Sequence, residues 1–289
     1  MAKLSNPTVI KDLLIRYGFR FTKALGQNFL IDSSVCPKMA AACGADADTA
    51  VLEIGPGIGV LTRELASTAK QVLAVEIDER LKPVLKETLS DLMNVTVKYG
   101  DVMKLDLRAL IREYFGDEQI CVCANLPYYI TSPLLMRLLE SELPLRSITV
   151  MVQKEAAQRI CAQPATRACG AVSITVRYYS EPEILFPVSR NSFMPPPGVD
   201  SAVIRLRLRE QPAVQVADEK WFFQVTRGAF AQRRKTAVNS LSHSLKLEKS
   251  QLQSVMRSLG LNETARAEQL SMSQFAVLSN HLIAFRKGV

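Results

Sequence analysis

Histidine is scarce in this chain, and the cysteines are not spaced as metal ligands. Only two histidines occur, at positions 243 and 281, and no two of the six cysteines form a C-x-x-C motif. Zinc sites and disulfide frameworks both need such residues at short, regular spacings. The sequence therefore predicts no metal site and reduced cysteines. Cys121 and Cys123 share one face of a predicted strand, and we interpret them as small core residues.

Long apolar runs are also missing. Hydrophobic residues make up 48% of the 289 positions, yet no run is long and apolar enough to span a bilayer. The chain opens Met-Ala-Lys-Leu-Ser-Asn-Pro, without the apolar core of a signal sequence. We expect a cytoplasmic protein without membrane contact, with apolar residues for one large core and a smaller one.

Acidic residues are few at the two ends of the chain, so the net charge of +8 is unevenly placed. Residues 1–30 carry five basic side chains and one acidic one, whereas residues 31–210 carry 20 and 22. Residues 211–289 carry 11 basic and five acidic side chains. A near-neutral body with two basic ends predicts a polyanionic partner that is held away from the reaction site.

Two sets of arginines are interpreted differently. Arg233, Arg234 and Lys235 are consecutive on a predicted helix, and we expect them to contact phosphates. The arginines at 205, 207 and 209 alternate with apolar residues, which is typical of an amphipathic strand whose polar face is solvated.

The first part of the chain alternates between strand and helix periods. A short helix is predicted at residues 8–16 and an extended arm at 17–32, and strands and helices then alternate between 50 and 160. Two late strands, at 172–178 and 203–208, would form an antiparallel edge. This order predicts a doubly wound α/β sheet.

Helical periods dominate after Gln211-Pro212. Four helices are predicted, at residues 221–231, 237–245, 249–259 and 272–285, with Ser271 as the N-cap of the last one. We therefore predict two domains: residues 1–210, an arm and an α/β domain, and residues 211–289, a smaller, basic, all-α domain.

The tetrapeptide Asn125-Leu126-Pro127-Tyr128 follows an apolar strand and precedes a helical segment. An amide oxygen and a backbone carbonyl can accept hydrogen bonds from both N–H groups of a planar amine. The proline fixes φ in the turn. The aromatic ring can stack on the heterocycle that bears the amine. The motif favours chemistry on an exocyclic amino group, although an ordinary strand-to-helix turn has the same residues.

A glycine-rich turn lies upstream, at Gly55-Pro56-Gly57-Ile58-Gly59. Its G-x-G-x-G spacing departs from the G-x-G-x-x-G of dinucleotide-binding turns, which disfavours a pyrophosphate ligand. Three acids, Glu53, Glu76 and Asp101, lie at the ends of three successive predicted strands, where open α/β sheets bind ligands. Glu76 could accept from ribose hydroxyls and Asp101 from an adenine amine. A carboxylate-rich site suits a sulfonium cation, so the pattern predicts S-adenosylmethionine.

These motifs carry a resemblance. The chain is similar over essentially its whole length to the ribosomal RNA adenine dimethyltransferases, especially the bacterial enzymes that act on small-subunit rRNA. The matching blocks are LGQNFL at 25–30, the loop at 53–59, Glu76, Gly100-Asp101, NLPY at 125–128, QKE at 153–155, FMPPP at 193–197 with VDSAV at 199–203, and AFAQRRK at 229–235.

The resemblance implies a Rossmann-like methyltransferase domain that dimethylates two adjacent adenosines near the 3′ end of small-subunit rRNA. It implies that Phe193 and Tyr128 flank the target base and that Asn125 and Leu126 accept from its amine. The implied cofactor residues are Gln27, Asn28, Leu30, Glu53, Gly55, Gly57, Glu76, Asp101, Val102 and Asn125. We expect a monomer whose partner is rRNA within an immature small subunit.

Other functions share parts of this pattern. Large-subunit rRNA methyltransferases that confer macrolide resistance share the cofactor blocks but typically have Asn-Ile-Pro-Tyr and a divergent tail. Protein glutamine methyltransferases have Asn-Pro-Pro-Tyr, which Leu126 disfavours. A mainly non-catalytic ribosome-assembly factor would keep only a relict cofactor site.

Overall fold

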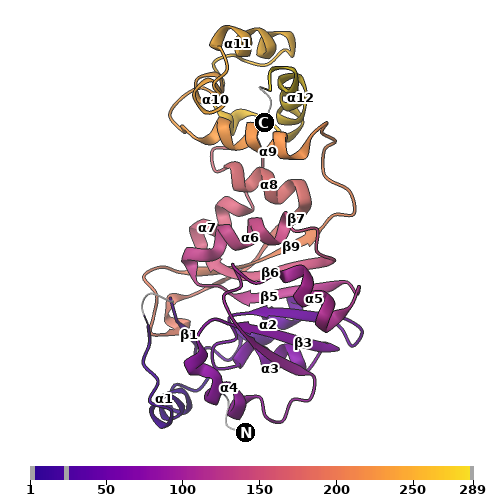
Figure 1. Ribbon diagram of the computed structural model, residues 1–289. Helices are drawn as coiled ribbons and strands as arrows, with labels where there is room; N and C mark the ends of the chain where they lie inside the picture. The colour runs from indigo at the N-terminus through magenta and orange to yellow at the C-terminus, as the bar shows by residue number, and fades with distance from the viewer. Residues whose placement is uncertain (1–3, 23–25, 287–289) are drawn as a thin grey trace. The chain divides into compact units, whose positions relative to one another are not determined.

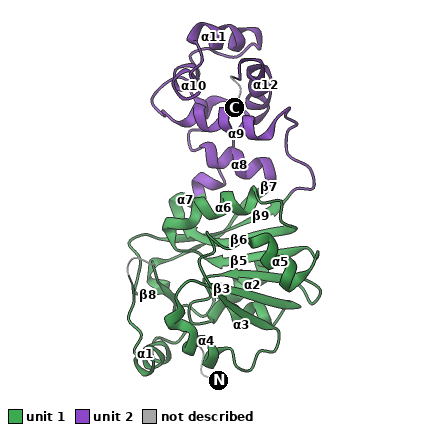
Figure 2. Cartoon of the chain, viewed as in Figure 1, with its two compact units in different colours: residues 1–157, 181–208 green, residues 158–180, 209–289 purple. Residues whose placement is uncertain are grey.

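The computed structural model describes residues 4–22 and 26–286, so Leu25 of the predicted block at 25–30 lies outside the described residues. The chain divides into two compact units, as Figure 2 shows. The first comprises residues 1–157 and 181–208, and the second comprises residues 158–180 and 209–289. The predicted division after residue 210 assigns 158–180 to the first part, whereas their contacts group them with the second.

The first unit is built on a sheet with the order β4-β3-β2-β5-β6-β9-β7, seven strands within the described part of the chain (Figure 1). Five strands from β4 to β6 are parallel, and β9 is antiparallel to β6. The strands are β2 (Ala50–Ile54), β3 (Gln71–Glu76), β4 (Val95–Tyr99), β5 (Ile120–Asn125), β6 (Leu145–Gln153), β7 (Ser180–Val188) and β9 (Ser201–Leu208). The predicted α/β sheet is confirmed, and of the two strands predicted for its antiparallel edge the one at 203–208 is found, within β9.

The order of the strands positions the functional site. From β2 the chain adds β3 and β4 on one side and then β5 and β6 on the other. All five residues of β2 are buried, as expected for a central parallel strand that is covered on both faces. Ligands bind outside the carboxyl ends of such strands where the order reverses, which here lies between β2 and β5.

The helices of this part follow the predicted alternation. They are α1 (Pro7–Arg16), α2 (Val35–Cys43), α3 (Val60–Ala66), α4 (Lys82–Thr88), α5 (Leu107–Phe115) and α6 (Thr131–Leu139), and α7 (Lys154–Ile160) begins in the first unit and ends in the second. Helix α2 packs on β5 and β6, and its Cys43 lies with Cys121 and Cys123 in a fully buried cluster. The interpretation of these two strand cysteines as core residues is confirmed.

A short second sheet joins the predicted arm to the proline-rich loop. Strand β1 (Phe29–Leu30) pairs antiparallel with β8 (Phe193–Met194), and Leu30 is opposite Phe193. Residues 163 positions apart in the sequence therefore lie side by side.

The strand predicted at 172–178 is wrong, because this segment is helix α8 (Ala171–Tyr179). Alternating Val172, Ile174 and Val176 imitate a strand, but packing in the second unit overrides that local preference. The Tyr178 ring lies 5.3 Å from the Phe222 ring, in the core of that unit.

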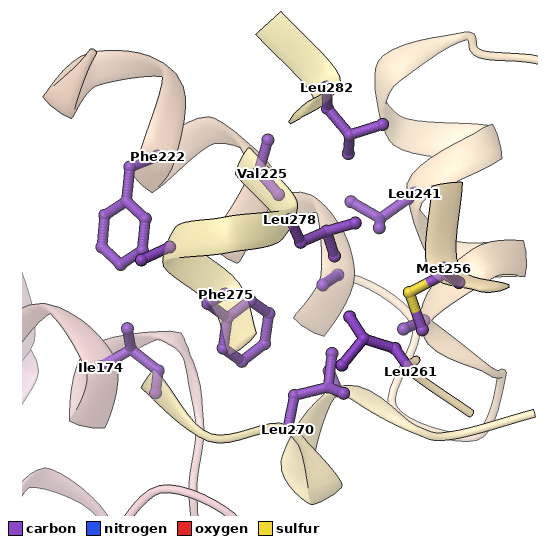
Figure 3. Packing of buried hydrophobic residues seen from close by; sticks show 14 of the residues in the cluster. Ile174, Phe222, Val225, Leu241, Met256, Leu261, Leu270, Phe275, Leu278 and Leu282 are labelled. Carbon is purple, nitrogen blue, oxygen red and sulfur yellow. The ribbon is translucent and has the colours of Figure 1, made fainter. Parts of the chain in front are cut away.

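The second unit is helical. After α8 it contains α9 (Glu219–Phe230), α10 (Ala237–Leu245), α11 (Lys249–Ser258) and α12 (Met272–Leu282). Figure 3 shows its core, where Phe222 and Val225 of α9, Leu241 of α10 and Leu278 of α12 are buried. Ser271 caps α12 as predicted, and its Oγ accepts from the Gln274 backbone N–H at 3.2 Å.

No helix among residues 4–22 and 26–286 is long and apolar enough to cross a membrane. Within the same described ranges, no group of histidine, cysteine and acidic side chains could hold a metal ion.

Candidate functional site

A pocket opens at the carboxyl ends of β2, β3, β4 and β5, all in the first unit. Its empty space, with the open mouth and adjoining solvent counted, is about 1140 Å³. The predicted site residues that line it are Gln27, Asn28, Leu30, Gly55, Gly57, Glu76, Asp101, Val102, Asn125, Leu126, Tyr128 and Phe193. Glu53 does not line it.

The floor of the pocket is the glycine-rich turn after β2. Gly55, Gly57 and Gly59 have φ values of 72°, 60° and 89°, a region that side-chain-bearing residues rarely adopt. A Cβ at Gly57 would lie 3.2 Å from the Phe29 ring, and one at Gly59 would lie 2.8 Å from Leu89 Cδ2. Glycine thus keeps backbone exposed to a ligand on one side while apolar side chains pack on the other.

Glu76 ends β3 beside this turn. Its side chain is 4% exposed, and its two oxygens accept from the backbone N–H groups of Gly57, at 3.2 Å, and Asp78, at 2.9 Å. Burial raises the pKa of Glu76, and the two backbone hydrogen bonds oppose that rise. The carboxylate is held in a fixed orientation, with lone pairs left for ligand hydroxyls.

Asp101 lies at the end of β4, on the same edge of the sheet. Its Oδ1 accepts from the Met103 backbone N–H at 2.9 Å, and its side chain is 29% exposed, with Lys104 Nζ 3.7 Å from Oδ2. Val102, 6% exposed, supplies an apolar wall beside it. An acceptor next to an apolar wall suits a planar ring that carries an amine.

Glu53 differs from the other two acids. It points into the fold from β2, is 1% exposed, and neither of its carboxyl oxygens has a hydrogen-bond partner among the described residues. Burial, followed by the negative charge of Glu76, raises the pKa of Glu53 to about 8. The group is therefore mainly protonated at neutral pH, and it is not among the residues that line this pocket.

Asn125, the last residue of β5, lies at the mouth of the crevice. Its side-chain amide makes no hydrogen bond within residues 4–22 and 26–286, and it lines the pocket. The Leu126 backbone N–H donates to the Met151 carbonyl at 3.3 Å, which fixes the turn while the Leu126 side chain is buried. Asn125 and Leu126 thus both line the pocket at the end of β5.

Two aromatic rings accompany these acceptors. Tyr128 lines the pocket, and its hydroxyl is 2.8 Å from Ser201 Oγ at the start of β9. Phe193 also lines the pocket, but it is 3% exposed and packs in the core with Leu30. It therefore has a core role in addition to any contact with a ligand.

Comparison with known proteins agrees with this geometry. The sequence profile described as ribosomal RNA adenine dimethylase matches residues 18–284. The chain is 49% identical to the ribosomal RNA small subunit methyltransferase A of Geobacillus thermodenitrificans, over 97% of each chain. It is 48% identical to the protein of that name from Bacillus licheniformis, over 96% of this chain and 97% of the relative. The chain belongs to the ribosomal RNA adenine dimethylase family.

Solved structures of similar fold include two RNA-modifying enzymes. The 23S rRNA methyltransferase ErmE superposes with a TM-score of 0.68 and 28% identity, over 89% of this chain and all of that one. A dimethyladenosine transferase from Plasmodium falciparum gives a TM-score of 0.71 and 26% identity, over 89% of this chain and 97% of its own.

This dimethylase is a methyltransferase, and its cofactor is S-adenosylmethionine. The pocket fits that cofactor: an oriented, buried carboxylate (Glu76) and a second acceptor (Asp101) lie on one edge, above a floor that only glycine allows. Acidic walls also suit the positive sulfonium centre.

The predicted arm residues of the dimethylase enter the pocket from the other side. Gln27 Nε2 donates to Asp78 Oδ2 at 2.7 Å, and Asn28 Nδ2 donates to the Gly26 carbonyl at 3.1 Å. Gln27 therefore already has a protein partner, whereas Leu30 is fixed by the β1–β8 pairing.

Several residues of the pocket region were not predicted from the sequence. Tyr129 lines the mouth beside Tyr128 and is 57% exposed, and Ile77 lines it at 47% exposure. The Arg137 guanidinium of α6 donates to the carbonyls of Met103 and Leu105 and so fixes the loop after Asp101. The adjacent Tyr128 and Tyr129 could have been noticed in the sequence. No sequence pattern indicates that Arg137 bonds to a distant loop.

The predicted basic cluster lies in the second unit of the dimethylase. Helix α9 ends at Phe230, so Arg233, Arg234 and Lys235 lie in the turn before α10 rather than on a helix. All three are exposed. Arg233 Nη2 donates to the Arg167 carbonyl at 3.4 Å.

Proposed function

We propose that this protein transfers methyl groups from S-adenosylmethionine to the exocyclic amines of two adjacent adenosines near the 3′ end of small-subunit rRNA, giving dimethyladenosine at each. The observation that carries the proposal is the Asn125 side-chain amide, which makes no hydrogen bond within the described residues and lines the same pocket as Leu126 and Glu76. The name of the relatives at 48–49% identity supports the small subunit as the substrate.

We assign the cofactor to one part of the pocket. Glu76 accepts from the ribose hydroxyls, Asp101 from the adenine amine, and Val102 packs on the adenine ring. Gly55 and Gly57 pass beneath the ligand, while Gln27, Asn28 and Leu30 lie over its methionine end. We assign Glu53 no direct contact with the cofactor, because it is buried and does not line the pocket.

The chemistry of this chain is positioning. S-adenosylmethionine, when bound, supplies the methyl group as a sulfonium electrophile. The lone pair of an adenine amine is delocalised into the ring. When Asn125 Oδ1 and the Leu126 carbonyl accept hydrogen bonds from the two N–H groups, a pyramidal nitrogen is favoured, and its lone pair becomes available for attack. Tyr128 and Phe193 hold the base that has left its stack. The methylated ammonium is acidic, so no strong general base is needed.

We further propose that the second unit holds the RNA. Arg233, Arg234 and Lys235 are exposed cations that can contact phosphates without touching the cofactor pocket. In this proposal a monomer acts in the cytoplasm on rRNA within an immature small subunit.

A methyl-incorporation assay tests the proposal. Labelled cofactor is supplied with naked small-subunit rRNA, immature small-subunit particles, mature small subunits and large-subunit rRNA. We expect labelled dimethyladenosine in the immature particles. Incorporation only into large-subunit rRNA would favour the ErmE-like alternative, and binding without incorporation would favour a non-catalytic assembly factor.

A further inference from the structure

Asp78 lies two residues beyond Glu76 and is almost as deeply buried, at 5% exposure. Its backbone N–H donates to Glu76 Oε1 at 2.9 Å, so one turn orients both acids. Its own carboxylate accepts from Arg80, at 2.8 Å from Nε to Oδ1 and 2.5 Å from Nη2 to Oδ2. This fork-shaped contact lowers the pKa of Asp78 and keeps it ionised.

The same arginine reaches the N-terminal arm. Arg80 Nη2 donates to Thr22 Oγ1 at 2.7 Å, and Nη1 donates to the Arg20 carbonyl at 3.4 Å. The guanidinium also lies over the Phe19 ring, 5.0 Å from its centroid. Phe19 in turn packs near Phe29, which lines the pocket.

Gln27 closes the network from the other side. Its Nε2 donates to Asp78 Oδ2 at 2.7 Å, and its Oε1 accepts from the Thr22 backbone N–H at 3.1 Å. Gln27 is thus bonded to the Asp78 carboxylate directly, and Thr22 is linked to it through Arg80 and Gln27. A mere surface ion pair would leave the arm untouched, whereas this one has a buried anchor and arm contacts on both sides.

We propose that Asp78 and Arg80 are positioning residues that hold the described arm residues, 19–22 and 26–30, against the cofactor pocket. Neither residue touches the reacting atoms. Asp78 sets the place of Gln27 relative to Glu76, and Arg80 holds Asp78 and the arm together. Cofactor affinity should therefore depend on side chains that do not line the pocket. This inference rests on the cofactor site proposed above.

Calorimetry with S-adenosylmethionine and the full chain, without RNA, tests this. We expect Arg80→Ala and Asp78→Asn to weaken binding about tenfold, and Arg80→Lys, which keeps the charge but loses the fork, to fall between Arg80→Ala and wild type. Arg63→Ala is the matched control: Arg63 makes two hydrogen bonds to the Asp91 carboxylate at 2.7 Å and one to the Thr88 carbonyl, and none to the described arm residues.

Limited trypsin digestion gives a second readout. Cleavage after Arg20 needs access to the carbonyl that accepts from Arg80. We expect Arg80→Ala to be cut there several-fold faster than wild type, and Arg63→Ala to be cut at the wild-type rate. A melting curve shows whether each variant is folded, and Arg80→Lys serves if Arg80→Ala is not.

Two results would overturn the proposal: affinity of Arg80→Ala within twofold of wild type, or weakening by Arg63→Ala of the same size. The first result overturns it even if cleavage is faster, because the arm would then be loosened without effect on the cofactor. Glu76→Ala separates this failure from that of the cofactor site. If Glu76→Ala loses affinity and Arg80→Ala does not, the site stands and the positioning role falls.

Discussion

At the scale of single residues, the two central polar groups of the pocket differ in what they already bind. Each oxygen of Glu76 accepts one backbone N–H, whereas the Asn125 amide has no bond within the described residues. A bonded acid is suited to holding a ligand in one pose. An unbonded amide is suited to a group that arrives, reacts and leaves. The two should therefore separate binding from chemistry.

Replacement of Asn125 tests the chemical role. Asn125→Ala should abolish methyl transfer and leave the affinity for S-adenosylmethionine within about tenfold of wild type, because the amide mainly contacts the reacting amine. Single-turnover methylation and calorimetry measure the two quantities. Equal loss of both would assign Asn125 chiefly to the cofactor.

Replacement of Glu76 tests the binding role. Glu76→Ala removes the acceptor for the ribose hydroxyls, and we expect it to weaken cofactor binding by about 1.5–3 kcal/mol, the range for hydrogen bonds to a charged group. Calorimetry measures the change, and unchanged affinity would remove Glu76 from the site.

The buried Glu53 makes stability depend on pH. Its pKa is about 8 in the folded chain and near 4.5 when solvated, so folding takes up a proton between these values. The contribution of Glu53 to the free energy of unfolding is fully present below pH 4.5. It is lost as the pH rises towards 8, by up to about 1.4 kcal/mol per pH unit. Glu53→Gln should remove this loss.

Melting curves at pH 5, 6, 7 and 8 measure the effect. The advantage of Glu53→Gln over wild type should grow with pH, whereas the exposed Glu113→Gln control should show no such trend. A constant difference between Glu53→Gln and wild type would mean that Glu53 has the same pKa in both states.

At the scale of elements, prediction succeeded where one period was clear and packing agreed with it. The parallel strands, α10 and the cap at Ser271 follow from local sequence. Helix α8 did not, because its alternating β-branched residues imitate a strand and only the rings of α9 decide the outcome.

The site shows the same division. Residues next to a strand end, such as Asn125 and Asp101, could be predicted to meet, because parallel strands end at one edge. The Arg80 contacts with the arm could not, since they join residues about 60 positions apart through side chains. Glu53 shows the limit of the rule, because a strand residue one place further back points into the core.

The capping box of α12 gives a test at this scale. Ser271 Oγ accepts from the Gln274 N–H, and Gln274 Oε1 accepts from the Ser271 N–H. Ser271→Ala should lower the free energy of unfolding by about 1 kcal/mol. Denaturant melts measure this, with the exposed Ser254→Ala of α11 as the control. Equal effects of the two changes would argue against the cap.

At the scale of the whole molecule, charge and chemistry lie in different units. The cofactor pocket belongs to the first unit, and the Arg233, Arg234 and Lys235 cluster belongs to the second. If the cluster binds rRNA phosphates, RNA binding and catalysis can be changed independently.

The triple change Arg233→Ala/Arg234→Ala/Lys235→Ala tests this independence. Affinity for the ribosomal particle should fall, and the slope of log affinity against log salt should become shallower by roughly one unit for each phosphate that the variant no longer neutralises. Cofactor affinity should stay unchanged. Titrations at three salt concentrations measure the slope, with a melting curve alongside because Arg233 also bonds to the Arg167 carbonyl. A slope of log affinity against log salt equal to that of wild type would show that these residues do not contact phosphates.

The second unit is discontinuous, since α8 arises before β7 and β9 of the first unit while its partner helices follow them. A single recombination near residue 210 would therefore not exchange the whole second unit between two relatives. It would pair α8 of one parent with α9 of the other, across the buried contact of Tyr178 with Phe222. Exchange of the intact second unit therefore needs two crossovers, so that α8 is carried along with α9 to α12.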